Sequence, residues 1–205
     1  MKKKFNSLSE MIQFYESDLQ QPLLQELELC RKIVLSSKVD DSKKAEVLLM
    51  GGHQWHLNLR PTEKEGIINT LKEAKLWKCN YTDFEDVYDK VVSTIGEKKY
   101  VGFLTCYDVA KRIGFCCGHE PECFVYLHSG ARKGAKNLLN IPRLSGNTMD
   151  KMRFATLLPG LSALHIENFL CIMKDIFVGG KINQEAEIDS NKCCFRCYFT
   201  IPEDL

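Results

Sequence analysis

The sequence has no long hydrophobic run and no motif of a common catalytic class. No stretch of the 205 residues approaches the roughly 18 consecutive apolar residues of a membrane-spanning helix. The basic start MKKKFNSLSE is not followed by the apolar segment of a secretory signal. A Walker-type phosphate loop and a Gly-x-Ser-x-Gly elbow are both missing. We therefore expect a cytoplasmic protein with no membrane partner and no cofactor, and the sequence assigns it no reaction.

The sequence also has no excess of charge of either sign. Its 28 Lys and Arg residues oppose 27 Asp and Glu residues, which gives a net charge of +1. This balance argues against a protein that coats nucleic acid through its overall charge, but it is compatible with a local basic patch. Hydrophobic residues make up 44% of the chain and charged residues 27%, as is typical of a globular protein.

Helical patterns occupy most of the chain. Ser7 or Ser9 is a plausible N-cap for the first pattern, and an apolar stripe at helical spacing follows it. Two further patterns begin with capping boxes, in which Thr62 precedes Glu65 and Thr82 precedes Glu85. The stripe consists of Leu23, Leu24, Leu27, Cys30, Ile33 and Val34.

The fold class that these patterns predict is mostly α. We expect a single multi-helical domain over residues 1–205, with a hairpin-like core region over 82–140. The cysteine-rich tail over 181–205 alternates apolar and polar residues in KCCFRCYFTIP, which predicts a short C-terminal strand or an extended arm.

Ten cysteines are many for a cytoplasmic chain, where they are expected to be thiols or metal ligands rather than disulfides. Four of them stand singly in helical patterns, as small buried hydrophobic residues do. Zinc could be held by the cluster near residue 119 together with the Cys-x-x-Cys pair of the tail. Because only the tail has regular ligand spacing, we favour unligated thiols and predict no metal site. The zinc candidates are Cys117, His119, Cys123, Cys194 and Cys197.

Residues 82–114 have the pattern of two helices joined by a glycine turn. We expect one helix over 82–95, a turn at KKYVG and a second helix from about Leu104. In such a hairpin the turn and the second helix's N-terminus present N–H groups to a phosphate. Gly102 and Thr105 fit the pattern, with Thr105 as the expected cap of the second helix. Tyr100 takes the place of the first glycine, where a positive φ is usual.

Residues 82–140 resemble the helix-hairpin-helix DNA glycosylases. In that family a Val-Asp-Thr-His stretch opens a helix about twenty residues after the hairpin; here the stretch is Val125-Tyr126-Leu127-His128, followed by SGARKGAKNLL. The resemblance implies a helical scaffold that binds nucleic acid. Tyr126 replaces the family's catalytic aspartate, and a neutral phenol cannot offset the positive charge of the sugar transition state. We therefore do not expect glycosylase catalysis by the family's route.

Two shorter strings, YDVAKRIG and YLHSGARKGA, are similar to those of an uncharacterised bacterial family and imply a shared pocket. The candidate catalytic residues are Asp108, His128 and Tyr126, with Asp108 and His128 as acid–base partners in one cleft. The alternative for Asp108 is a surface ion pair with Arg112, four residues on. The candidate nucleic-acid-binding residues are Gly102, Thr105, Arg112, Gly130, Arg132, Lys133, Gly134 and Lys136.

Two functional interpretations follow. The first is a nucleic-acid-binding or base-recognising module, which would use the hairpin turn and the basic helix start at 130–136. The second is a helical protein-interaction subunit of a bacterial complex. In that case Gly130 and Gly134 would serve close helix packing, and the cysteine-rich tail would contact a partner.

Overall fold

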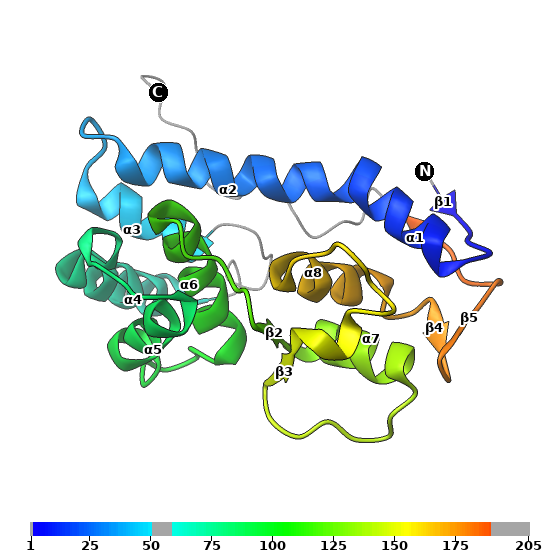
Figure 1. The fold of residues 1–205 in the computed structure, drawn as a ribbon. Coiled ribbons are helices and arrows are strands. Elements are labelled where there is room, and N and C mark those ends of the chain that lie inside the picture. Colours follow the sequence, from blue (N-terminus) through cyan, green and yellow to red (C-terminus); the bar gives the residue numbers. More distant parts are fainter. Residues whose placement is uncertain (1, 51–58, 190–205) are drawn as a thin grey trace. The chain divides into compact units, whose positions relative to one another are not determined.

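The computed structural model describes residues 2–50 and 59–189. It is mostly helical with short C-terminal strands, so the predicted fold class is confirmed. The chain forms two compact units (Figure 1). That they make one domain stays a prediction. Of the described residues, unit 1 comprises 2–21 and 121–189, and unit 2 comprises 22–50 and 59–120.

All regular secondary structure in the described part of unit 2 is helical. Helix α6 packs against both α5 and α3, and α4 packs against α3 and α5. The first two residues of α2 belong to unit 1 and the rest to unit 2. The elements are α2 (Gln20–Leu35), α3 (Asp41–Met50), α4 (Pro61–Ala74), the 3-10 helix η3 (Leu76–Lys78), α5 (Phe84–Ile95) and α6 (Phe103–Cys117).

Two helices of unit 2 were predicted to have a threonine N-cap, and each has another residue as its N-cap. Helix α4 begins at Pro61, since proline has no N–H to leave unpaired in a first turn. The backbone N–H of Arg60 donates to Glu63 Oε2 at 3.3 Å. Helix α5 has Asp83 as its N-cap, and its carboxylate accepts from the N–H of Asp86 at 2.8 Å. Aspartate is the stronger cap, so the cap falls one residue after Thr82.

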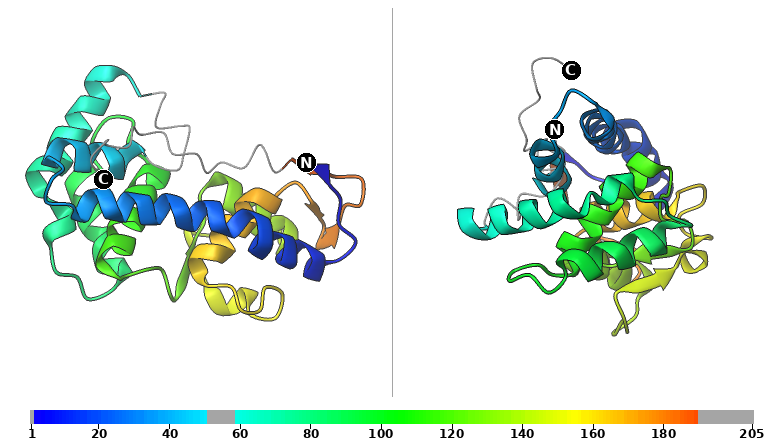
Figure 2. Two further views of the ribbon diagram at one scale, coloured as in Figure 1. Left: turned by 90° about the horizontal axis from the view of Figure 1, so that it is seen from above. Right: turned by 90° about the vertical axis from the view of Figure 1, so that its left-hand side faces the viewer.

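Unit 1 combines helices with three antiparallel strand pairs, and its α7 and α8 pack closely together (Figures 1 and 2). Ser7 caps the first helix, as predicted, by accepting from the N–H of Glu10. The helices are α1 (Leu8–Phe14), the π-helix η1 (Tyr15–Leu19), α7 (Ser129–Leu139), the 3-10 helix η4 (Lys151–Phe154) and α8 (Ala163–Met173). The strand pairs are β1 (Lys2–Lys3) with β6 (Ile188–Asp189), β2 (Phe124–Tyr126) with β3 (Thr148–Asp150), and β4 (Phe177–Val178) with β5 (Lys181–Ile182).

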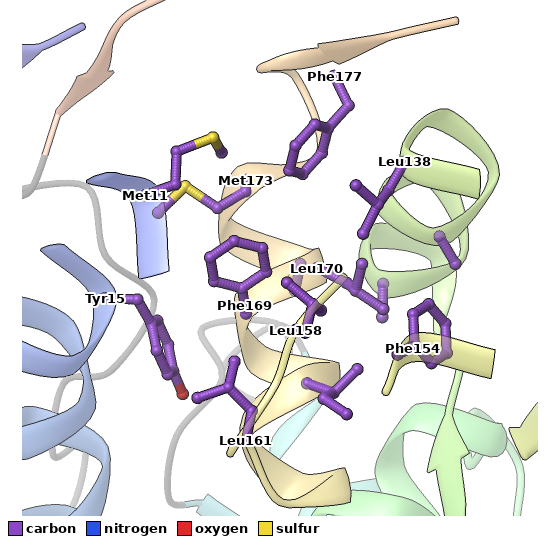
Figure 3. Packing of buried hydrophobic residues seen from close by; sticks show 14 of the residues in the cluster. Met11, Tyr15, Leu138, Phe154, Leu158, Leu161, Phe169, Leu170, Met173 and Phe177 are labelled. Carbon is purple, nitrogen blue, oxygen red and sulfur yellow. The ribbon is translucent and has the colours of Figure 1, made fainter. Parts of the chain in front are cut away.

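The core of unit 1 forms around α8. Phe169 lies among side chains from α1, η1 and α7, and its ring meets that of Tyr15 edge-on at a centroid distance of 5.6 Å (Figure 3). Helix α8 therefore has apolar residues on most of its surface. Of its polar residues, Glu167 and Asn168 are buried and His165 is half-buried. Within residues 2–50 and 59–189, no helix has the length and apolar character that a membrane span requires.

Candidate functional site

The predicted hairpin is present in unit 2. Helix α5 ends at Ile95 and α6 begins at Phe103, one residue before the predicted start. Gly102 is the N-cap, with extended backbone (φ −122°) and no side chain to cap the helix. Thr105 lies inside the first turn and is buried, so the prediction that it caps α6 is wrong. A Cβ at Gly102 would have no atom within 4 Å, so packing does not require a glycine there.

Tyr100 has a φ of +67°, the left-handed conformation that the first hairpin glycine requires. Its ring is 53% exposed, and the Nζ of Lys99 lies 4.9 Å from its centroid. The turn thus has the expected backbone shape despite the side chain.

A Tyr100→Val variant is expected to lose about 1–2 kcal/mol of stability, because a β-branched residue fits this conformation poorly. Tyr100→Gly relieves the same strain and is expected to be at least as stable as the parent. Urea denaturation of the two variants measures the difference. Equal stability of Val and Gly at this position would contradict the assigned turn.

Arg112 is fully buried in unit 2 and does not reach the surface where a phosphate would bind. Its Nε donates to Glu26 Oε1 at 3.0 Å, and its Nη1 donates to the carbonyls of Leu48 (3.3 Å) and Asp108 (3.0 Å). Burial alone would lower the pKa of the guanidinium, but the Glu26 and Asp108 carboxylates outweigh it and raise that pKa. The assignment of Arg112 to nucleic-acid binding is therefore corrected: it holds α2, α3 and α6 together.

Asp108 is also buried, and its carboxylate accepts from Lys111 Nζ at 3.2 Å. The predicted surface ion pair with Arg112 is therefore wrong. Asp108 belongs to unit 2 and His128 to unit 1, so their acid–base partnership stays a prediction. Gly102 and Thr105 likewise belong to unit 2, and the basic residues of α7 to unit 1.

His128 has a different carboxylate partner in unit 1. Its Nε2 lies 2.5 Å from Glu167 Oε1, and its Nδ1 accepts from the backbone N–H of Gly130 at 3.2 Å, which caps α7. Since Nδ1 accepts, the ring proton of neutral His128 sits on Nε2 and is donated to Glu167. His128, Glu167 and Tyr126 are all buried. Glu167 was not predicted from the sequence. The feature that could have indicated it is a carboxylate within the otherwise largely apolar string ALHIENFLCIM.

A second polar network lies at the other edge of α8. The Tyr15 hydroxyl lies 2.9 Å from His165 Nδ1 and accepts from Asn168 Nδ2 at 3.0 Å. The amide nitrogen of Gln20 donates to His165 Nε2 at 3.0 Å, so Nδ1 carries the ring proton. Burial lowers the pKa of His165, against the opposing effect of Glu167, and this keeps the ring neutral at pH 7. None of these residues was singled out from the sequence.

The two glycines of α7 serve packing. A Cβ on Gly134 would lie 2.1 Å from the carbonyl oxygen of Leu170, and one on Gly130 would lie 2.6 Å from the Sγ of Cys171. The helices α7 and α8 therefore approach each other at a distance that only glycine permits. The packing alternative stated for Gly130 and Gly134 is correct, and their assignment to nucleic-acid binding is not supported.

The basic residues of α7 differ in their contacts. Arg132 donates to the carbonyls of Leu144 and Gly146 and to Asn147 Oδ1, so it fixes the loop after α7. Lys133 is exposed and pairs with Asp175 at 2.6 Å, a surface pair of small energetic value. Lys136 is half-buried in the last turn of the helix.

Two exposed apolar side chains lie at the β2–β3 pair of unit 1. Phe124 is 41% exposed and Met152 is 73% exposed. The strand register pairs Phe124 with Asp150 at the end of β3, and Met152 follows two residues later in η4. The sequence signal was Met152 between Lys151 and Arg153 in KMRF.

No family model, curated protein or solved structure matches this chain. The resemblance to DNA glycosylases accordingly stays a prediction. In residues 2–50 and 59–189, no group of three or more His, Cys, Asp or Glu side chains could hold a metal ion. Cys194 and Cys197, which the zinc alternative requires, lie outside those residues.

Proposed function

We propose that unit 1 binds nucleic acid through residues 129–157, here called the basic segment. This segment contains six Arg or Lys residues and a single acidic residue, Asp150. The observation that carries the proposal is this local charge in a chain whose net charge is only +1. The six basic residues are Arg132, Lys133, Lys136, Arg143, Lys151 and Arg153.

Three of these side chains are exposed, namely Lys133, Arg143 and Arg153, and Lys133 would exchange its surface pair with Asp175 for a phosphate. Arg132 has a different role, because its guanidinium is bonded to the loop that carries Arg143 toward β3. It shapes the basic segment rather than contacting a ligand. A charge reversal at Arg132 would therefore disturb the fold and is a poor test of binding.

Phe124 and Met152 favour a ligand with unpaired bases. An exposed ring and a thioether next to Lys151 and Arg153 combine the base-stacking and phosphate-binding groups of single-strand binding surfaces. A double helix would offer its phosphates but would keep its bases stacked. The ligand is thus a single strand or a single-stranded region, encountered in the cytoplasm.

The same exposed residues favour a second candidate function, a helical protein-interaction subunit. Val178, 61% exposed, adds a third apolar side chain in unit 1. Apolar surface of this kind also binds proteins. Binding that survives high salt would support this alternative, whereas phosphate contacts are lost as salt rises.

The test is the fluorescence anisotropy of a labelled 20-nucleotide single strand and of its duplex in about 50 mM salt. The variant Arg143→Glu/Arg153→Glu is expected to bind the single strand about tenfold or more weakly than the parent, since it reverses two phosphate contacts. The control Lys38→Glu/Lys72→Glu changes the charge equally at exposed positions of unit 2 and is expected to bind as the parent does. Equal binding by all three proteins, or no binding by the parent, would reject the proposal.

A further inference from the structure

We propose that Cys30 of α2 and Cys116 of α6 form an oxidation-sensitive pair, which a peroxide converts to a disulfide that clamps these two helices of unit 2 together. The proposal is independent of nucleic-acid binding. Both cysteines are free thiols in the structure, and both are buried, at 0% exposure for Cys30 and 8% for Cys116.

The ion pair between α2 and α6 shows how the two cysteines are placed. Arg112 Nε of α6 donates to the Glu26 carboxylate of α2 at 3.0 Å. Cys30 lies four residues after Glu26, and Cys116 lies four residues after Arg112. Residues four apart in a helix lie on the same face, one turn from each other. Cys30 and Cys116 are thus the corresponding residues one turn further along both helices.

The two thiols are in contact. Burial raises the pKa of Cys30 well above its ordinary value, and a hydrogen bond with the Cys116 thiol raises it further. The charge of Glu26 raises the same pKa and that of Arg112 lowers it, so the thiols and the ion pair belong to one cluster. Two cysteines whose side chains already meet need only a small backbone movement to reach the geometry of a disulfide.

The reaction balances with hydrogen peroxide as the oxidant. The Cys116 sulfur, which has some exposure, attacks a peroxide oxygen; the S–O bond forms, the O–O bond breaks, and the departing hydroxide takes the thiol proton as water. The Cys30 sulfur then attacks the Cys116 sulfur, the S–O bond breaks, and a second water leaves with the Cys30 proton. The two thiols lose two electrons, and the peroxide gains them.

The raised pKa of Cys30 makes this disulfide slow to form and slow to reverse. The thiolate is the attacking species, and little of it is present at neutral pH when the pKa is high. A thiol of high pKa is also a poor leaving group, so glutathione is expected to reopen the disulfide slowly. The pair therefore responds to sustained rather than brief exposure to peroxide.

Peptide mass spectrometry of the non-reduced protein, over a time course with hydrogen peroxide, tests the pair. Exposed Cys123 of unit 1 is expected to be oxidised first and shows that the treatment works. Cys106 is the matched control: it lies on the same helix as Cys116, is 3% exposed, and among the described residues no other thiol shifts its pKa. The Cys30–Cys116 disulfide is expected to form at least about tenfold faster than Cys106 is oxidised. Equal rates would overturn the proposal.

Cys117 provides a second way to contradict the assignment. Burial raises its pKa to about 11, and the thiols of Cys116 and Cys79 raise it further, so it is the competing partner in the same region. A disulfide that joins Cys79 to Cys117 and leaves Cys30 a thiol would overturn the proposal.

The variant Cys30→Ser separates the clamp from general oxidation. Peroxide is expected to raise the urea midpoint of the parent by about 1 M, because the disulfide constrains the unfolded chain, and to leave that of Cys30→Ser unchanged. In Cys30→Ser the oxidised Cys116 has lost its partner, so dimedone is expected to label it as a sulfenic acid. The same midpoint shift in both proteins would show that the pair is not the clamp.

Discussion

Replacing Arg112 by methionine is expected to lower the free energy of unfolding by about 3–5 kcal/mol, because Glu26 then stays buried without its cation. Both side chains are almost fully buried, at 0% and 2% exposure. Within the described residues, Arg112 Nη2 and Glu26 Oε2 make no hydrogen bond, so a single bond of 3.0 Å joins the pair. Urea denaturation followed by circular dichroism measures the loss.

The double variant Glu26→Leu/Arg112→Met is expected to recover a large part of that loss, because it removes both buried charges together. Arg31→Met is the matched control. Arg31 pairs with Glu28 on the exposed face of α2 at 3.2 Å, and its loss is expected to change stability by less than about 1 kcal/mol. An Arg112→Met variant as stable as Arg31→Met would show that the buried pair is not structural.

Gly134→Ala is expected to destabilise unit 1 by about 2 kcal/mol. The added methyl would meet a carbonyl oxygen of α8 at 2.1 Å, so the two helices must move apart. This cost exceeds the roughly 1 kcal/mol that alanine gains over glycine inside a helix. Gly66→Ala in α4 is the control, since a Cβ there meets nothing within 4 Å.

Gly66→Ala is expected to stabilise the protein by about 1 kcal/mol. Close packing at Gly134 but not at Gly66 therefore predicts stability changes of opposite sign for the two substitutions. If Gly134→Ala were also stabilising, the close approach of α7 and α8 would be wrong.

Features that depend on residues adjacent in the sequence were predictable. The helices, the Ser7 cap and the position of the α5–α6 turn follow from spacing and from local hydrogen-bonding rules. The left-handed backbone at Tyr100 followed from the hairpin pattern, even though the residue itself argued against it. The two predicted threonine caps were wrong by one or two residues. Pro61 is favoured as the first residue of a helix, and Asp83 is a stronger N-cap than the adjacent threonine.

The partners of the polar residues were not predictable, because tertiary packing selects them. Arg112 meets Glu26 across 86 residues, and Tyr15 meets His165 across 150. The string YDVAKRIG drew attention to Arg112 as a surface cation, but its neighbours in the fold enclose it completely. His128 was singled out from the sequence, but its partner Glu167 became visible only when α7 and α8 were placed together.

The salt dependence of single-strand binding tests the proposed function most directly. Each phosphate contacted on a single strand contributes about −0.7 to the slope of log K against log salt concentration. The exposed residues Lys133, Arg143 and Arg153 therefore predict a slope of about −2 for the parent. For Arg143→Glu/Arg153→Glu the predicted slope is much shallower. A parent slope near zero, or no binding at low salt, would contradict the account.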